Sequence, residues 1–221
     1  MRKLYLLRHA ETTANADGTL QGRLDYPLTE RGRAQAEALA QPLASLGCEL
    51  VLRSPAERVL RTIEPALEVG LAAPEVVDEL HEIDLGDAAG LSFGEFLERF
   101  GPTIDEESYA RGEYRFPGGE SRRDLYQRAA QAWRFIERRD ADTVLLASHG
   151  GLLSQLLAVV LDLPNDGRVR FRLDNAALTT LVWFRGQPFL SRFNEREHLT
   201  ASLRSPVFAP RIFEGASPAA K

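Results

Sequence analysis

The alternation of short apolar runs with helical patterns is the strongest constraint on the fold of this chain. Residues 4–7, 50–52 and 143–147 are apolar runs that end abruptly at polar residues or glycines, as buried strands do. Amphipathic helical patterns lie between these runs. Strands that alternate with helices favour right-handed crossovers and a largely parallel sheet covered on both faces. We therefore expect an α/β protein, a three-layer α/β/α sandwich with a mostly parallel central sheet.

Start and stop signals locate the helices. Thr29 is a candidate N-cap for an alanine-rich helix that ends near Gly47, and Ser54-Pro55 resembles a cap followed by proline at the first helical position. Further helices are predicted over 93–100, 121–139 and 152–161, and a hairpin at a sheet edge over 177–184 and 189–193. We expect one domain over 1–204, followed by an irregular tail, rich in Pro, Ala and Gly, over 205–221.

Charge and residue usage narrow the classes of function. The formal net charge is −5, which argues against a nucleic-acid or membrane partner, because both need a positive surface. Lys3 and Lys221 are the only lysines, which excludes phosphate-loop and Schiff-base lysine chemistry. Cys48 is the single cysteine, so neither an internal disulfide nor a cysteine zinc cluster can form. We expect it to be a buried residue at a helix-to-strand turn.

The lengths of the apolar runs indicate where the protein is located. The apolar stretch near the N-terminus is too short for a signal peptide, and no run approaches the ~20 apolar residues of a membrane span. We therefore expect a cytoplasmic protein.

Two histidines follow predicted strands directly. His9 comes after Arg8 at the end of the first strand, and His149 follows the strand over 143–147 and precedes Gly150 and Gly151. In open parallel sheets, ligands bind outside the carboxyl ends of the strands. Glycines at the start of a helix also let an anion approach the backbone N–H groups.

Arginines near these histidines predict a site for a dianion. Arg8 is adjacent to His9, and Arg58 lies four residues after Ser54. Guanidinium groups bind phosphoryl oxygens in bidentate fashion. Their positive charge also keeps His9 neutral near pH 7. A neutral imidazole has a free lone pair that can attack phosphorus while the arginines and His149 hold the equatorial oxygens.

Six segments, in order, resemble the motifs of the histidine phosphatase superfamily, also called the phosphoglycerate mutase-like family. The resemblance extends from Leu4 to about Leu199. The matching segments are Leu7-Arg8-His9-Ala10-Glu11-Thr12 with Asn15, Gln21-Gly22-Arg23-Leu24-Asp25-Tyr26-Pro27-Leu28-Thr29 with Gly32, Ser54-Pro55 through Arg58 to Thr62, Leu80-His81-Glu82-Ile83-Asp84-Leu85-Gly86, Pro117-Gly118-Gly119-Glu120-Ser121, and Ser148-His149-Gly150.

The resemblance implies a phosphoglycerate mutase-like fold and a role for each site residue. His9 would be the phosphohistidine nucleophile, and Glu82 the proton donor to the leaving alkoxide. The catalytic phosphate pocket would be formed by Arg8, Arg58 and His149. The further phosphate- or substrate-binding residues would be Asn15, Gln21, Gly22 and Gly150. No metal and no cofactor are expected.

Departures from the family pattern bear on the reaction. After Gly86 many members have an acidic residue, Trp, Glu and Gly, whereas this chain has Asp87-Ala88-Ala89-Gly90, which alters the expected substrate rim. The stretch from Glu82 to His149 is shorter than the resemblance implies for the mutase branch, whose insertion carries basic residues that hold phosphoglycerate for retransfer. The candidates for a modest substrate clamp in this stretch are Arg111, Tyr114, Arg115, Arg122 and Arg123.

We therefore expect a metal-independent phosphomonoester hydrolase that acts through a phosphohistidine intermediate on a small phosphorylated metabolite. A cofactor-dependent phosphoglycerate mutase and a non-catalytic phosphate-binding module on the same fold remain the alternatives. The motifs do not select the metabolite or the oligomeric state, although the edge hairpin makes a homodimer possible.

Two other interpretations of the site, a serine hydrolase and a metal hydrolase, use some of the same residues. Gly90 to Gly94 fits a G-x-S-x-G nucleophile elbow around Ser92, with Asp124 or Asp142 and then His149 in the chain order of serine hydrolases, but 83–89 is a poor strand. A metal hydrolase would draw on the ligand types of His9, His81, Glu82, Asp84 and His149. We expect His81 to be a loop residue and His198 a surface or packing residue near the C-terminus.

Overall fold

The computed structural model describes residues 1–165 and 170–205 and contains a six-stranded sheet of order β3-β2-β4-β1-β5-β6. Four strands run parallel: β1 (Lys3–Arg8), β2 (Leu50–Arg53), β3 (Glu75–Val76) and β4 (Thr143–Ser148). Two antiparallel strands, β5 (Leu178–Phe184) and β6 (Gln187–Glu195), complete one edge. The mostly parallel sheet and the edge hairpin are both confirmed.

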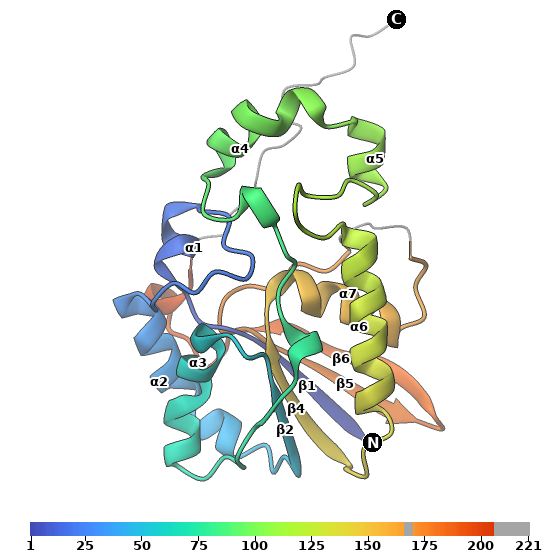
Figure 1. Ribbon diagram of the computed structural model, residues 1–221. Coiled ribbons are helices and arrows are strands. Elements are labelled where there is room, and N and C mark those ends of the chain that lie inside the picture. The colour runs from blue at the N-terminus through green and yellow to red at the C-terminus, as the bar shows by residue number, and fades with distance from the viewer. Residues whose placement is uncertain (166–169, 206–221) are drawn as a thin grey trace, which may run out of the picture.

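Helices cover both faces of the sheet, because successive strand side chains point to opposite sides. On one face, Leu4 and Leu6 pack with α6 (Arg122–Ile136) and α7 (Gly150–Val160). On the other, Leu7 packs with α2 (Glu30–Ala44) and α3 (Glu57–Glu68). Figure 1 shows the two pairs of helices flanking the strands. The predicted α/β/α sandwich is therefore correct.

A smaller group of elements lies beyond the carboxyl ends of the strands, at the top of Figure 1. It contains α4 (Phe93–Phe100), α5 (Glu106–Ala110) and the short 3₁₀ turns η2 (Gly86–Ala88) and η3 (Gly101–Thr103). Its own apolar cluster is centred on Leu85, Ala88 and Phe96. The remaining short elements are α1 (Thr13–Asp17), η1 (Asp78–Leu80) and η4 (Ala201–Leu203).

Capping explains where several helices begin. The Thr29 hydroxyl accepts a hydrogen bond from Gly32 N at the start of α2, as predicted. The prediction for Ser54 is wrong, because α3 begins at Glu57 and has no side-chain cap from its N-cap residue. The Asp25 carboxylate instead accepts the Glu57 N–H at 3.0 Å.

Other boundaries differ by a few residues from the sequence prediction. Helix α7 begins at Gly150 rather than Leu152, and α6 ends at Ile136 rather than Arg139. The serine elbow lacks its strand: Ser92 follows η2 and caps α4 by accepting from Glu95 N.

Further predictions concern Cys48, the C-terminal tail, the edge hairpin and membrane-spanning helices. Cys48 lies at the turn between α2 and β2 but is only partly buried; burial raises the pKa of its thiol to about 11. The Ser205 hydroxyl accepts a hydrogen bond from Gln35 at 2.9 Å, and the rest of the predicted tail, 206–221, lies outside the described residues. The edge hairpin exposes Phe184 and Phe189, and the homodimer stays a prediction. Within the described ranges, no helix has the length and apolar character needed to span a bilayer.

Candidate active site

Two histidines lie side by side at the carboxyl ends of the central strands. Strands β1 and β4 pair in parallel with Arg8 opposite Ser148, so the next residue of each chain segment, His9 and His149, reaches the same place. Their ring centroids are 5.3 Å apart with an interplanar angle of 62°. Both residues are buried, at 4% and 0% exposure. The sheet therefore builds a pair of imidazoles, as the sequence predicts.

Two arginines add positive charge beside this pair. The Arg58 guanidinium is buried and donates to the Asp25 carboxylate at 2.9 Å and to the carbonyls of Leu24 and Gly22, both at 2.8 Å. Arg8 donates to the Leu173 carbonyl at 2.6 Å. Each guanidinium is therefore held by the protein through some of its N–H groups.

Gly150 leaves space for Arg8. A Cβ at Gly150 would lie 3.2 Å from Arg8 Nε, so a glycine allows the guanidinium to lie against the start of α7. Direct binding of phosphate by Gly150 stays a prediction.

Burial and the two arginines keep the imidazoles neutral. Burial, and then the charges of Arg58 and Arg8, hold the pKa of His9 well below its usual value. Burial, and then Arg58 and His9, do the same to the pKa of His149. The nitrogen Nδ1 of His9 lies 2.7 Å from the Ala10 carbonyl, which can only accept, so Nδ1 carries the proton. The lone pair of His9 is therefore on Nε2, the form required of a nucleophile.

Ser54 has a function at this site that the sequence interpretation missed. Its hydroxyl accepts the Ala56 N–H at 3.3 Å and lies 2.8 Å from His149 Nε2. A buried hydroxyl normally donates its proton, and among the described residues His149 Nε2 is the acceptor within its reach. We therefore assign the single proton of the neutral ring to Nδ1. His149 Nδ1 and Arg8 Nε are both buried and have no partner among the described residues. Buried donors normally find an acceptor, and a bound anion would supply one.

The predicted binding residues gather around the arginines. The Gly22 carbonyl accepts from Arg58, and the side-chain oxygen of Gln21 accepts from Arg58 at 3.2 Å. The side-chain oxygen Oδ1 of Asn15 accepts from the Asn175 amide at 3.0 Å, and this amide also donates to the His9 backbone carbonyl at 3.1 Å. No local pattern marks Asn175, since its partners lie more than a hundred residues away in sequence.

Glu82 lies at the start of α7, beside the histidines. Its two carboxylate oxygens accept the N–H groups of Gly151 at 2.9 Å and Leu152 at 3.0 Å. Its charge also acts on both Arg8 and Arg58. The sequence predicts that an anion binds at the start of α7. In the structure, the Glu82 side chain occupies this position. The structure thus brings the predicted site residues together, while their roles stay predictions.

The arginines proposed as a substrate clamp are engaged with their neighbours. Arg111 pairs with Glu107 and Glu113, and Arg123 pairs with Glu113 at 3.0 Å. Arg115 pairs with Asp124 at 2.8 Å, and the Arg122 guanidinium lies over the ring of Tyr109. Three of these four arginines therefore have an acidic partner.

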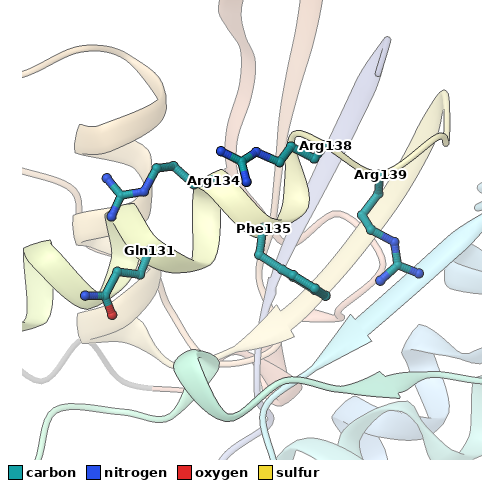
Figure 2. Close-up of a pocket in the computed structure, with 5 residues that line it drawn as sticks. All are labelled: Gln131, Arg134, Phe135, Arg138 and Arg139. Carbon is teal, nitrogen blue, oxygen red and sulfur yellow. The ribbon is translucent and has the colours of Figure 1, made fainter.

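The remaining candidate features lie apart from the histidine pair. Within residues 1–165 and 170–205, no cluster of three or more His, Cys, Asp or Glu side chains could hold a metal ion, so the five side chains of the metal-hydrolase alternative do not form one. His198 packs by donating to the Ala176 carbonyl at 2.9 Å. A hollow of about 400 Å³ on the exposed side of α6 is lined by Gln131, Arg134, Phe135, Arg138 and Arg139 (Figure 2) and contains no residue of the site.

Comparisons with known proteins agree on the family. The chain is 31% identical over 199 residues to a probable phosphoglycerate mutase GpmB from Cronobacter sakazakii, covering 86% of this chain and 89% of the relative. Among solved structures, a putative alpha-ribazole-5'-P phosphatase from Escherichia coli superposes with a TM-score of 0.78 at 27% identity, covering 88% of this chain and 98% of that one.

A mycobacterial glucosyl-3-phosphoglycerate phosphatase also has a TM-score of 0.78, at 28% identity, covering 89% of this chain and all of the other. The family model of the histidine phosphatase superfamily (branch 1) matches residues 4–196. The chain therefore belongs to the histidine phosphatase superfamily.

Proposed function

We propose that this protein is a metal-independent phosphomonoester hydrolase that transfers the phosphoryl group through His9. The observation that carries the proposal is the pair of buried, neutral imidazoles, 5.3 Å apart, beside the guanidiniums of Arg8 and Arg58. The arrangement supplies a nucleophilic nitrogen, a second ring with a free N–H donor, and positive charge for a phosphate dianion.

The first step forms the phosphoenzyme. The lone pair on His9 Nε2 attacks phosphorus, and the N–P bond forms as the ester P–O bond breaks. Glu82 enters this step as the neutral acid, the form that a bound phosphate dianion favours over the carboxylate. The leaving alkoxide takes its proton and departs as an alcohol. Arg8, Arg58 and His149 Nδ1–H stabilise the charge on the equatorial oxygens.

The second step returns the enzyme to its starting state. Water attacks phosphorus and gives a proton to the Glu82 carboxylate, while the N–P electron pair returns to His9 Nε2. Inorganic phosphate leaves and Glu82 is again protonated. Atoms and charge balance over the two steps, and no metal or cofactor is required.

The pairing of the arginines after α4 favours hydrolysis over retransfer. Mutase chemistry needs cations that keep a phosphorylated acid in the site, whereas Arg111 and Arg123 share the carboxylates of Glu107 and Glu113. The names of the relatives keep the mutase as the second candidate, since one is a probable phosphoglycerate mutase. The two solved phosphatases are named for alpha-ribazole-5'-P and glucosyl-3-phosphoglycerate, and such small phosphorylated metabolites are the substrate class we propose.

A turnover screen tests the proposal. We expect the wild-type protein to release phosphate from several small phosphomonoesters after exhaustive chelation, and the variant His9→Ala to release none. During turnover, wild type should carry an acid-labile, base-stable phosphoryl label. Mutase activity dependent on 2,3-bisphosphoglycerate, measured in parallel, would favour the second candidate. Phosphate binding without either activity would leave only the non-catalytic module.

A further inference from the structure

A single guanidinium holds the loop that carries Glu82. Arg128, on α6, donates to the carbonyls of Glu79 at 2.9 Å, His81 at 2.6 Å and Glu82 at 3.0 Å. It also forms a bidentate pair with the Glu120 carboxylate, at 2.9 and 2.7 Å. A guanidinium has five N–H groups, and these five acceptors use all of them.

Glu120 holds the same loop two residues further on. Its carboxylate accepts the Asp84 N–H at 2.9 Å, and its own N–H donates to the Asp84 carbonyl at 2.8 Å. The chain around it packs too closely for side chains: a Cβ at Gly119 would lie 2.3 Å from the Asp84 carbonyl oxygen, and one at Gly86 would lie 2.0 Å from that of Pro117. Arg128 and Glu120 therefore fix the backbone on both sides of Glu82.

The side chain of Glu82 is fixed separately, on the start of α7. Its backbone carbonyl faces Arg128, and its carboxylate reaches the helix beside His149. The Arg128 and Glu120 side chains are 13% and 17% exposed, so water screens this pair little. Glu82 Oε1 also accepts the N–H of Ile83, in the same loop, at 2.9 Å. A shift of this backbone therefore moves the carboxyl group, and a proton donor must lie within hydrogen-bond reach of the leaving oxygen.

We propose that Arg128, held by Glu120, is a positioning residue that aims the carboxyl group of Glu82 at the leaving oxygen. It does not touch the substrate. This inference rests on the proposed function, because it requires Glu82 to protonate an alkoxide as the P–O bond breaks.

The dependence of kcat/KM on the leaving group tests the role of Arg128. An alkyl phosphate, such as 2-glycerophosphate, needs the proton, whereas p-nitrophenyl phosphate expels a stable anion and needs it little. Lysine has three N–H donors for five acceptors. We expect Arg128→Lys to lower kcat/KM for the alkyl ester by about tenfold or more, since general acid catalysis is worth about 10²–10⁴. We expect the value for the aryl ester to change by less than about threefold.

The matched control is Arg139→Lys. Arg139 also makes a bidentate pair, with Glu75 at 2.8 and 2.6 Å, but beyond the far end of α6, in the hollow of Figure 2. We expect no change with either ester. Glu120→Gln weakens the Arg128–Glu120 pair from the other side and should give a smaller loss with the same selectivity. It provides a second variant if Arg128→Lys fails to fold.

The outcomes separate the two proposals. If Glu82→Gln discriminates between the esters but the folded Arg128→Lys and Glu120→Gln variants lower both rates equally, or neither, the positioning role is overturned and the proposed function stands. If the wild-type protein hydrolyses no phosphomonoester, the proposed function fails and the positioning role with it.

Discussion

The chemistry of single residues at this site depends on which nitrogen of each imidazole carries a proton. A backbone carbonyl fixes the proton of His9 on Nδ1, and the Ser54 hydroxyl fixes that of His149 on Nδ1 as well. The two rings are therefore assigned the same tautomer but have opposite tasks in the proposed mechanism: His9 offers a lone pair from Nε2, whereas His149 offers an N–H donor. Both tasks need neutral rings, which burial and the arginines favour.

Removing the Ser54 hydroxyl should weaken the phosphate pocket. In Ser54→Ala, His149 loses the donor that fixes its tautomer. A net hydrogen bond is worth about 0.5–1.5 kcal/mol, so we expect kcat/KM to fall by up to about tenfold, equally for alkyl and aryl esters. Steady-state kinetics measures this, with exposed Ser202→Ala as the control. Unchanged kinetics would show that the hydroxyl does not set the tautomer.

Removing the positive charge of Arg58 should make His9 easier to protonate. Because a neighbouring cation disfavours the imidazolium, the pKa of His9, held well below its usual value in the wild-type protein, should rise in Arg58→Gln. Nitrogen NMR of labelled histidines across pH 4 to 8 measures the titration of His9 in the wild-type protein and in the variant. Arg61→Gln, one turn further along α3 and exposed, serves as control. A wild-type midpoint at the usual value would contradict this account of the nucleophile.

At the scale of elements, local sequence patterns predict the helix boundaries that are set by hydrogen bonds between nearby residues. The caps Thr29 and Ser121 act on residues three positions away, so the sequence locates α2 and α6. Ser54 has the same local signature, but its hydroxyl is used by His149, which lies 95 positions away. Contacts of Arg128 with the Glu82 loop, nearly fifty positions away, have no local signature at all. The motif resemblance includes Ser54 and Glu120 without indicating which residues they contact, and it does not include Arg128.

The first turn of α7 has room for Glu82 only because residue 151 is glycine. A Cβ there would lie 2.5 Å from Glu82 Oε1, so Gly151→Ala should displace the carboxyl group while the helix itself gains a better helix former. We expect kcat/KM for alkyl phosphates to fall by about tenfold or more and the Tm to change little. Equal losses for alkyl and aryl esters would contradict a specific effect on the proton donor.

The control for this substitution is Gly94→Ala. Gly94 also lies in the first turn of a helix, α4, where a Cβ would come no closer than 3.9 Å, to the Ser92 hydroxyl. The two variants therefore differ in what the new methyl group contacts and not in the helical context. We expect Gly94→Ala to leave both esters unaffected.

At the scale of the whole molecule, the parallel sheet assembles a site from distant parts of the chain. Strands β1 and β4 end at the same edge and deliver His9 and His149, while α3 supplies Arg58 and the segment after η1 supplies Glu82. The alternation of strands and helices is enough to predict this edge. It does not predict the loop that places Asn175 on the His9 carbonyl, because loop conformations depend on long-range contacts.

A ligand that joins these parts should stabilise the entire fold. Ligand at about a hundredfold its Kd adds about 2.7 kcal/mol to the free energy of unfolding, and each kcal/mol raises the Tm of a domain of this size by about 2–4 °C. Orthovanadate, a phosphate analogue, should therefore raise the wild-type Tm by about 5–10 °C in calorimetry with chelator present. In Arg58→Gln the shift should largely vanish, whereas sodium chloride of equal ionic strength should change neither Tm. A vanadate shift that survives in Arg58→Gln would mean that the anion binds elsewhere and that the site beside Arg8 and Arg58 is not the phosphate site.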